Sequence, residues 1–490
     1  MANAMQANPN RATHATAARQ LRRAVSLLLL NLPLTALAGP AAPADDPADD
    51  DIEALLRQAA ADDARNAAAA APQVPVAKSA PATTAPTATG NLHGFAQLEM
   101  ARTLERPAHW SKLLGRLEVG STGKLSPDVK WKLSARADYD AVFDVTRYYD
   151  DFGAVRRDQR FNLSLRENYL DVGAGDWEFR FGRQHVIWGE MVGLFFADVV
   201  SARDMREFIL PEFNLLRIPQ WAARAEYFKG DFHGELLWVP APTYDESGKP
   251  GAEFFPYQPV YAGYDTAYRN ESKPARRPAN GNYGLRAGWL KNGWDLSAFA
   301  YRSTDAAPTF AREVTPGLVT YEARHDRISQ FGGTLAKDFG DMVLKAETVY
   351  TRGRGLSVLR LADSDGLSRQ NTLDWALGLD FALPAETRLN VQLFQSLITN
   401  SRDADLIQDK AENGYSVLLN GKLAPRWEAE VLWVASLNRN DWMLRPKVNW
   451  SFEKNWRLTL GADVFHGPPL GYFGRYNQQD RIYTEVRYSY

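Results

Sequence analysis

The 490-residue sequence contains no cysteine. This absence excludes disulfide bonds, thiolate zinc sites, iron–sulfur clusters and thiol nucleophiles. The chain also lacks an excess of charge of either sign, because 57 lysine and arginine residues stand against 59 aspartate and glutamate residues. Such a balance provides no overall electric field that would favour nucleic acid or an acidic partner.

Long hydrophobic runs are missing beyond the N-terminal region. No later segment holds the roughly 18 consecutive apolar residues that a membrane-spanning helix requires. A mature chain embedded in a membrane must therefore cross it with strands. Near the N-terminus, the pair Arg22-Arg23 precedes an apolar run over residues 24–37, and a small residue, Ala38, follows. This pattern predicts a secretory signal peptide over residues 1–38, with a run too short to serve as a membrane anchor.

The next segment, residues 39–90, is rich in alanine and proline. Within it, residues 49–71 begin with acidic side chains, which is a helix-start signal, and contain a narrow apolar stripe. Two interpretations stay open: a short solvated helix, or a periplasmic segment that plugs the barrel or mediates oligomerisation. The Pro/Thr/Ala-rich residues 72–89 are typical of a disordered linker.

The stretch over residues 160–188 introduces the pattern that fills the rest of the chain. With a period of two, one face of the first expected strand is apolar and the other is polar. The apolar face holds Phe161, Leu163, Leu165 and Tyr169, and the polar face holds Asn162, Ser164, Arg166 and Asn168. After a turn over residues 173–176, the alternation resumes from Trp177, so the stretch predicts a β-hairpin.

Repetition of this unit predicts eighteen strands from residue 91 to residue 490. The expected strands span residues 91–101, 112–121, 128–139, 160–172, 176–187, 219–229, 231–239, 281–290, 293–302, 327–338, 341–351, 371–382, 386–398, 413–423, 426–437, 442–452, 455–465 and 479–490. Short turns alternate with long loops, apart from the connections 102–111 and 438–441. Such alternation is the signature of an outer-membrane barrel.

The expected fold is therefore all-β. It is a transmembrane, antiparallel up-and-down β-barrel over residues 91–490, with sixteen strands as the alternative to eighteen, preceded by the signal peptide and a disordered or helical segment. Closure is required because lipid offers the backbone no hydrogen-bond partners. The expected location is the outer membrane of a Gram-negative bacterium.

Tryptophans gather beside the expected short turns, where an interfacial aromatic girdle would lie. An aromatic-rich soluble core is the alternative explanation of the composition. The expected girdle residues are Trp131, Trp177, Trp289, Trp294, Trp427 and Trp456.

Charged residues on the polar face of the expected strands should line the lumen. The expected lumen-lining residues are Lys112, Arg116, Lys130, Lys132, Arg136, Arg166, Arg180 and Arg224 on early strands, and Asp374, Asp380, Glu428 and Glu430 on later ones. Two interpretations stay open. Separate basic and acidic walls would favour anionic or zwitterionic solutes, or the charges would merely solvate the lumen and pair across strands.

The long loop over residues 188–218 is unusually apolar for a connection that projects into water. Folding into the barrel would bury its apolar side chains and would place its charged ones at a constriction; packing over the rim or between subunits is the alternative. The expected constriction residues are Asp198, Arg203, Asp204, Arg206 and Glu207.

The same region resembles a known family. The matching motifs are Gly182-Arg183-Gln184-His185-Val186-Ile187-Trp188-Gly189-Glu190, Asp198-Val199-Val200, Arg206-Glu207-Phe208 and Arg217-Ile218-Pro219. They resemble those of a proteobacterial outer-membrane family catalogued as a domain of unknown function, which is more distantly similar to the alginate-export barrel. Ser201-Ala202 departs from the Asn-Pro that such proteins carry after the second motif. The resemblance implies an eighteen-stranded, channel-like barrel and supplies no substrate.

Enzyme signatures are sparse. The chain has seven histidines and no Gly-x-Ser-x-Gly or His-Glu-x-x-His motif. His185 is the strongest hydrolase candidate, and a structural role for it is the alternative. The expectation is a non-enzymatic outer-membrane channel, porin-like or an export conduit, that passes small anionic or amphipathic solutes through a polar lumen. A closed structural or partner-binding barrel and an outer-membrane hydrolase are the alternatives.

No cofactor or metal site is expected, and no nucleic-acid partner. Outer-membrane lipid is an expected partner of a transmembrane barrel. The barrel-assembly machinery is another, because Tyr488-Ser489-Tyr490 resembles the C-terminal signal of barrel proteins. An inner-membrane exporter or periplasmic partner and a homo-oligomer are further expectations.

Overall fold

The computed structural model describes residues 91–189, 191, 196–400 and 405–490. The predicted signal peptide over 1–38 and the alanine- and proline-rich segment over 39–90 lie outside the described residues. Within the described ranges, no helix is long and apolar enough to cross a membrane.

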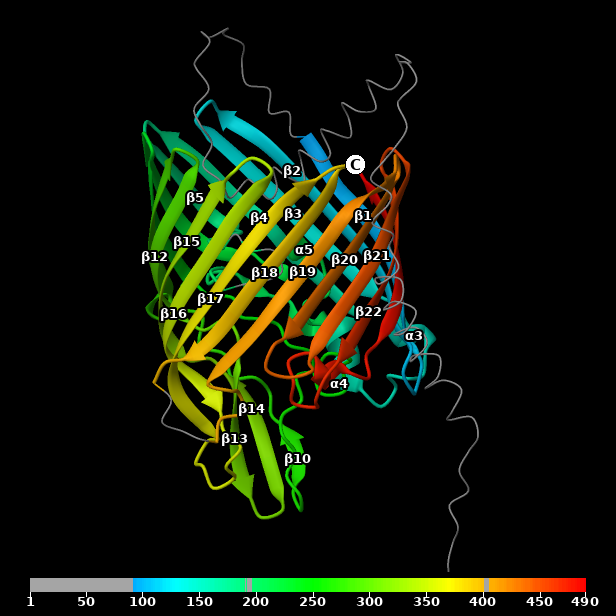
Figure 1. Ribbon diagram of the computed structural model, residues 1–490. Helices are drawn as coiled ribbons and strands as arrows, with labels where there is room; N and C mark the ends of the chain where they lie inside the picture. The colour runs from blue at the N-terminus through cyan, green and yellow to red at the C-terminus, as the bar shows by residue number, and fades with distance from the viewer. Residues whose placement is uncertain (1–90, 190, 192–195, 401–404) are drawn as a thin grey trace, which may run out of the picture. The chain divides into compact units, whose positions relative to one another are not determined.

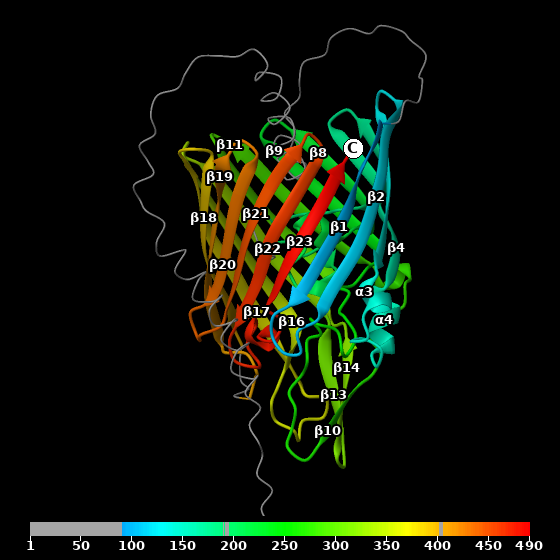
Figure 2. The same cartoon turned by 90° about the vertical axis from the view of Figure 1, so that its right-hand side faces the viewer.

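Eighteen antiparallel strands form one closed sheet, which confirms the predicted strand number (Figure 1). In order around the barrel they are β1 (Asn91–Thr103), β2 (Trp110–Ser126), β3 (Val129–Asp140), β4 (Phe161–Ala174), β5 (Trp177–Gln184), β8 (Gln220–Lys229), β9 (Phe232–Ala241), β11 (Asn282–Lys291), β12 (Trp294–Thr304), β15 (Arg327–Asp338), β16 (Met342–Ser357), β17 (Leu367–Leu383), β18 (Thr387–Ile398), β19 (Ala411–Ala424), β20 (Trp427–Ser436), β21 (Trp442–Glu453), β22 (Trp456–His466) and β23 (Arg481–Ser489). The last strand lies beside the first, with Ser489 opposite Phe95 (Figure 2). This pairing closes the barrel.

Tight turns connect the strands at one end of the barrel, called here the turn rim. Asn292 and Gly293, between β11 and β12, have φ values of 52° and 73°. A two-residue turn of this kind requires positive φ at both positions and matches the twist of the flanking strands.

Long connections lie at the opposite end, called here the loop rim, and carry the remaining short elements. These are α3 (Val142–Val145), α4 (Gly153–Gln159), β6 (Ala202–Arg203), η1 (Met205–Glu207), α5 (Phe213–Leu216), β7 (Arg217–Ile218), β10 (Asp265–Tyr268), η2 (Pro278–Asn280), β13 (Thr309–Thr315), β14 (Leu318–Arg324) and η3 (Gly474–Tyr476). Strands β10, β14 and β13 form a small projecting sheet beyond the loop rim (Figure 1). Sequence reasoning treated these connections as irregular loops and missed that sheet.

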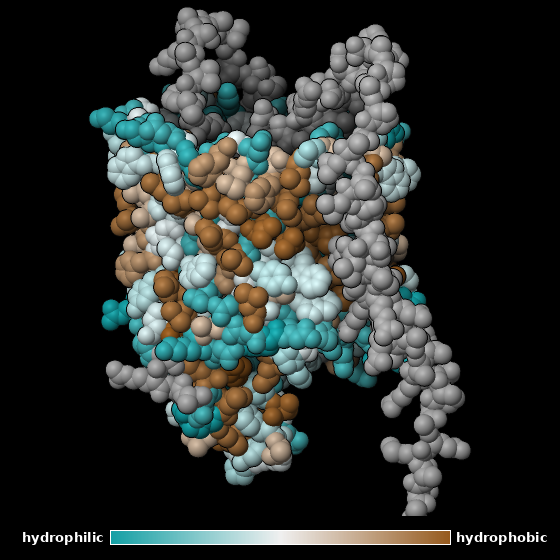
Figure 3. Space-filling model, in the orientation of Figure 1, coloured by the Kyte–Doolittle hydropathy of each residue, from teal (hydrophilic) through white to brown (hydrophobic). Residues whose placement is uncertain are grey.

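The outer surface of the barrel is apolar. Leu163 and Leu165 of β4 are 69% and 53% exposed, whereas Arg166 beside them is 4% exposed. Hydrophobic side chains cover the middle of the face that Figure 3 shows, with hydrophilic ones toward its two ends. A closed ladder with an apolar exterior is what a lipid bilayer demands of a strand protein. The protein is accordingly an outer-membrane β-barrel.

The predicted girdle tryptophans lie beside the turn rim. Trp177, Trp289, Trp294, Trp427 and Trp456 are between 39% and 52% exposed, and Trp131 is half-buried. The ring of Trp427 stacks on Trp450 with centroids 5.2 Å apart. Exposed tryptophans also occur near the loop rim, at Trp110, Trp221 and Trp238, which sequence reasoning did not select.

The predicted faces of β4 need one correction. A bulge lies opposite β3, where Leu133 pairs with Asn168 but Ala135 pairs with Leu165. Beyond a bulge the alternation of side chains shifts by one residue. Tyr169 therefore lies under the guanidinium of Arg180, 4.2 Å from ring centroid to Cζ, rather than on the apolar face.

Candidate functional site

The segment between β5 and β8, residues 185–219, lies inside the barrel and is called here the inserted segment. Its described residues contact side chains on eight of the eighteen strands, on both sides of the barrel. These wall residues are Lys112 of β2, Arg136 of β3, Arg166 of β4, Glu235 of β9, Glu347 of β16, Arg445 of β21, Arg457 of β22 and Arg481 and Arg487 of β23. Because the partners surround it, the segment crosses the lumen.

Glu207 anchors one side of the inserted segment. Its carboxylate lies 2.7 Å from Nζ of Lys112 and 3.5 Å from a guanidinium nitrogen of Arg481. Lys112 also donates to Glu99 across 2.9 Å. Burial alone would raise the pKa of Glu207, but the charges of Lys112 and Arg481 outweigh it and lower that pKa to about 2. Glu207 is therefore ionised and holds two wall cations.

Glu347 anchors the opposite side from β16. Its carboxylate accepts hydrogen bonds from the backbone N–H groups of Met191 at 2.8 Å and Ala197 at 3.1 Å. Nearby, the indole N–H of Trp188 donates to Glu235 across 3.1 Å. Sequence reasoning missed both carboxylates because they belong to strands far along the chain from the segment they hold.

Three further contacts hold the middle of the inserted segment. Glu212 accepts from Arg457 at 2.9 Å and from Arg487 at 3.1 Å. Arg445 donates to the carbonyl of Leu210 across 2.6 Å and to Asp463 across 2.7 Å. Charge-assisted bonds of this kind are shorter and stronger than neutral ones, so the middle of the segment is attached to β21, β22 and β23.

Arg136 and Arg166 contact the end of the inserted segment through its backbone. Arg166 donates to the carbonyls of Asn214 and Arg217 at 2.7 Å and 2.8 Å, and Arg136 donates to that of Leu215 at 3.4 Å. The nearest carboxylate oxygen to Arg166 is 3.9 Å away, on Glu118. Arg136 also lies 3.4 Å from a carboxylate oxygen of Asp138. Carbonyl oxygens carry only partial charge, so the positive charge of Arg166 is less fully neutralised than that of a tightly ion-paired arginine.

The expected constriction residues bond chiefly to one another and to the adjacent connections. Asp198 accepts from Arg217 at 2.8 Å, and Asp204 accepts from Arg206 at 2.8 Å. The charge of Arg217, opposing the effect of burial, lowers the pKa of Asp198. The backbone N–H of Arg203 donates to Asp245 of the next long connection across 2.8 Å. Together with Glu207, all five residues lie within the inserted segment.

The expected lumen-lining cations lie in carboxylate pairs. The pairs are Lys112–Glu99, Arg116–Asp138, Lys132–Glu167, Arg136–Asp138, Arg166–Glu118, Arg180–Asp171 and Arg224–Glu226. Lys130 is exposed near the turn rim. Sequence reasoning overlooked the acidic partners, although they lie on the same polar faces. Five of these pairs join different strands, and Arg136–Asp138 and Arg224–Glu226 each lie along one strand, so the geometry favours paired charges over a separate basic wall.

Most of the expected acidic residues of the lumen wall also lie close to a side chain of opposite charge. Asp374 lies 3.7 Å from Arg354, Asp380 lies 2.9 Å from Arg388, and Glu430 lies 3.0 Å from Lys447. Glu428 is exposed near the turn rim. The lumen wall is therefore polar and locally balanced in charge.

Apolar clusters lie beside these charges within the barrel. One gathers Trp188 and Val200 of the inserted segment with Phe299 and Tyr301 of β12. Another gathers Phe208 and Leu210 with residues including Met443 of β21 and Phe465 of β22. Burial of these side chains, at about 25 cal/mol per Å² of apolar surface, stabilises the inserted position of the segment.

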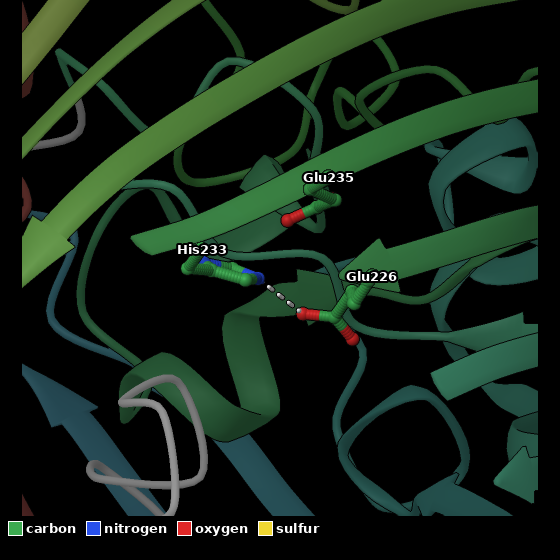
Figure 4. A group of neighbouring side chains, drawn as sticks. All are labelled: Glu226, His233 and Glu235. Carbon is green, nitrogen blue, oxygen red and sulfur yellow. Dashed lines mark hydrogen bonds and ion pairs between the residues drawn. The ribbon is translucent and has the colours of Figure 1, made fainter. Parts of the chain in front are cut away.

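Glu226, His233 and Glu235 form the one group among the described residues with the donor set and proximity of a metal site (Figure 4). One donor atom from each lies within 4.8 Å of the others. The carboxylate of Glu226 already pairs with Arg224 at 2.7 Å and with His233 at 3.2 Å, and Glu235 accepts from Trp188. These partners satisfy the carboxylates without a metal ion.

His185, the hydrolase candidate, follows directly after β5. Burial lowers the pKa of His185 to about 4. Its Nδ1 atom is buried and has no hydrogen-bond partner among the described residues. The serine that a hydrolytic pair requires therefore does not contact that nitrogen.

Comparison with known proteins gives a family. Residues 24–490 match the family described as "Protein of unknown function (DUF1302)". The chain belongs to this family. The DUF1302 match covers the whole barrel, in agreement with the resemblance drawn from the motifs. No curated protein matches the sequence.

Solved structures of outer-membrane barrels are similar to this DUF1302 chain at low identity. One is OccAB4 of Acinetobacter baumannii, with 9% identity, a TM-score of 0.48, and coverage of 82% of this chain and 98% of that one. Another is OmpF of Salmonella typhi in complex with daunomycin, with 9% identity, a TM-score of 0.43 and coverage of 82% and 98%. A third is a loop deletion mutant of OmpT, an outer membrane protein of Vibrio cholerae, with 11% identity, a TM-score of 0.38 and coverage of 82% and 99%.

Proposed function

We propose that this protein is a passive outer-membrane channel whose inserted segment forms the constriction. The observation that carries the proposal is the attachment of this segment to wall residues on both sides of the lumen, at Glu207 and at Glu347. Eighteen-stranded barrels are wide enough to enclose an aqueous channel, so a segment that crosses the lumen sets the width of the path.

The solutes we propose are small and anionic or amphipathic. Arg166 chiefly supports the anionic preference, because it contacts the inserted segment through carbonyl oxygens and lies 3.9 Å from its carboxylate partner; neighbouring Arg136 contacts the segment in the same way but also lies 3.4 Å from Asp138. The clusters around Trp188 and Phe208 support the amphipathic one, since they present apolar surface next to charged pairs. A solute with a carboxylate and an apolar body matches both features.

Planar-bilayer recording of the purified protein tests the channel. We expect stepwise conductance and, in a salt gradient, a reversal potential that favours anions. Arg136→Gln together with Arg166→Gln should shift that potential toward cations, whereas Lys130→Gln at the turn rim should leave it unchanged. A folded barrel that never conducts would reject the channel, and an unchanged potential in the double variant would reject the role of the two arginines.

A closed, partner-binding barrel is the second candidate. The density of apolar packing around Phe208 and Phe465 favours it, because such packing could seal the lumen. The same recordings separate the two candidates, since a sealed barrel gives no current at any voltage.

The N-terminal region belongs to the proposal as well. We propose that residues 1–38 are removed on export and that residues 39–90 reach into the periplasm, where an exporter or another periplasmic protein binds them. Mass spectrometry of the mature chain and crosslinking from residues 49–71 would test these two points.

A further inference from the structure

The lipid-facing surface of the barrel carries a groove that crosses six strands, from β5 to β15. Its volume is about 640 Å³. The side chains that line it from outside are Phe179, Phe181, Ala223, Ala225, Leu236, Trp238, Tyr283, Leu285, Ala300, Arg302, Ser329 and Phe331. They belong to the outward faces of neighbouring strands, so the groove opens toward lipid and not toward the lumen.

Alanines on β8 and β12 make the surface hollow. Ala225 lies opposite Leu236, and Ala300 lies opposite both Leu285 and Phe331 in the strand register. A methyl side chain reaches less far from the sheet than its larger neighbours. The alanines therefore form the floor of the groove, and the larger side chains form its walls.

From β5 to β12 the groove approaches the loop rim. Phe181 lies four residues from the start of β5 at the turn rim, whereas Arg302 lies eight residues from the start of β12 at that rim. One row of paired residues joins them, because the register runs from Phe181 through Trp238 and Tyr283 to Arg302. Because the strands are tilted, this row of residues makes the groove run obliquely across the lipid-facing surface.

Cationic side chains lie at the end of that row nearest the loop rim. Arg302 donates to the hydroxyl of Ser329 across 2.7 Å, and exposed Arg352 of β16 pairs with Ser329 in the register. Among the described residues, neither arginine makes an ion pair, in contrast with the paired arginines of the lumen wall. Two unpaired guanidinium groups thus face outward where the apolar surface ends.

We infer that the groove binds an acyl chain of a phosphorylated glycolipid of the outer leaflet, the lipopolysaccharide class, with its phosphate on Arg302 and Arg352. The long-loop end of such barrels faces the cell exterior, so the two arginines lie at the depth of outer-leaflet phosphates. Guanidinium groups bind phosphate through paired charge-assisted hydrogen bonds. Aromatic walls and an alanine floor fit a hydrocarbon chain, and charge complementarity selects an anionic headgroup.

Native mass spectrometry of the full-length protein in detergent, with purified lipopolysaccharide added, tests this inference. Arg302→Gln with Arg352→Gln should raise the apparent dissociation constant for lipopolysaccharide about fivefold, which corresponds to the loss of about 1 kcal/mol of charge pairing. Arg102→Gln is the matched control, because Arg102 is exposed near the loop rim on β1, away from the groove. Equal binding by the double variant and the wild type would overturn the headgroup assignment.

Filling the groove gives a second, independent test. Ala225→Leu and Ala300→Leu, made separately, should each reduce the bound glycolipid, whereas Ala96→Leu on the outward face of β1 should not. Heat-dependent migration in gels verifies that each variant is folded. If the groove holds phosphatidylethanolamine equally well, or if a second copy of the chain covers it as a mass-resolved dimer, the inference is wrong.

Discussion

The inserted segment and the projecting sheet are both formed by long connections at the loop rim, yet different contacts stabilise them. The inserted segment is held by side chains of the barrel wall, such as Lys112 and Glu347. The projecting sheet is held by its own backbone ladders, with β10 parallel to β14 and β14 antiparallel to β13, and by Arg312 of β13, which donates to the carbonyls of Val358 and Arg360 just after β16. The first is therefore coupled to the lumen, whereas the second is attached to the loop-rim end of the barrel.

Removal of the inserted segment should have the largest effect. Replacing residues 191–216 by a short glycine–serine linker would open the lumen that the segment crosses, and we expect single-channel conductance to rise several-fold. Planar-bilayer recording measures it, with heat-dependent gel migration as the check on folding. An unchanged conductance would mean that the path does not pass the segment.

Removal of one anchor should have the next largest effect. Glu207→Gln removes the carboxylate that Lys112 and Arg481 share. Lys112 keeps Glu99 and Arg481 keeps Asp463, so we expect a cost of about 2 kcal/mol, typical of one lost hydrogen bond to a charged group. We expect noisier open-channel current and a lower denaturation midpoint. Glu428→Gln, at an exposed position near the turn rim, is the control and should change neither.

Acid should release the same anchor. The folded-state pKa of Glu207 is about 2, below its ordinary value of 4.5. The Glu207 carboxylate therefore makes its full contribution to the free energy of unfolding above about pH 4.5, and this contribution is lost as the pH falls toward about 2. Current noise should rise in this window, and this rise should be smaller in Glu207→Gln. Asp198 and Glu212 also have lowered pKa values, so some rise should remain in the variant.

Removal of the projecting hairpin should have the smallest effect. Replacing residues 309–324, which comprise β13 and β14, by a short linker leaves the barrel ladder intact. We expect unchanged conductance and a shift of the thermal midpoint below about 2 °C. A collapse of barrel stability would show that the two connections do not differ as argued above.

Sequence reasoning found the barrel strands because lipid imposes a strict rule on each of them. A strand between lipid and water must alternate, and each tight turn interrupts the alternation, so the pattern is local. The prediction for Tyr169 was wrong because of the bulge on β4, where one extra residue moves each following side chain to the other face of the sheet. The sequence of β4 does carry a signal of that insertion, because its apolar residues shift from odd positions, such as Leu163 and Leu165, to the even positions Leu170 and Val172.

The candidate site was predictable only in part. The apolar character of residues 188–218 pointed to burial, and the charged residues of the segment could be selected from the sequence alone. Their partners could not, because Glu347 and Arg445 lie 156 and 235 residues from the backbone groups that they bind. Periodicity shows which face such a residue occupies and gives no information on what lies opposite across the lumen.

The seam between β1 and β23 also bears on biogenesis. Gly94 and Tyr490 exchange two backbone hydrogen bonds of 3.0 Å, and the pairing of β1 with β23 continues from Phe95 opposite Ser489 to Thr103 opposite Arg481. Until β23 has been exported, β1 keeps an open edge with unsatisfied amide and carbonyl groups. Such an edge is a template for pairing with other chains, so closure of this seam removes the last site for edge-to-edge aggregation.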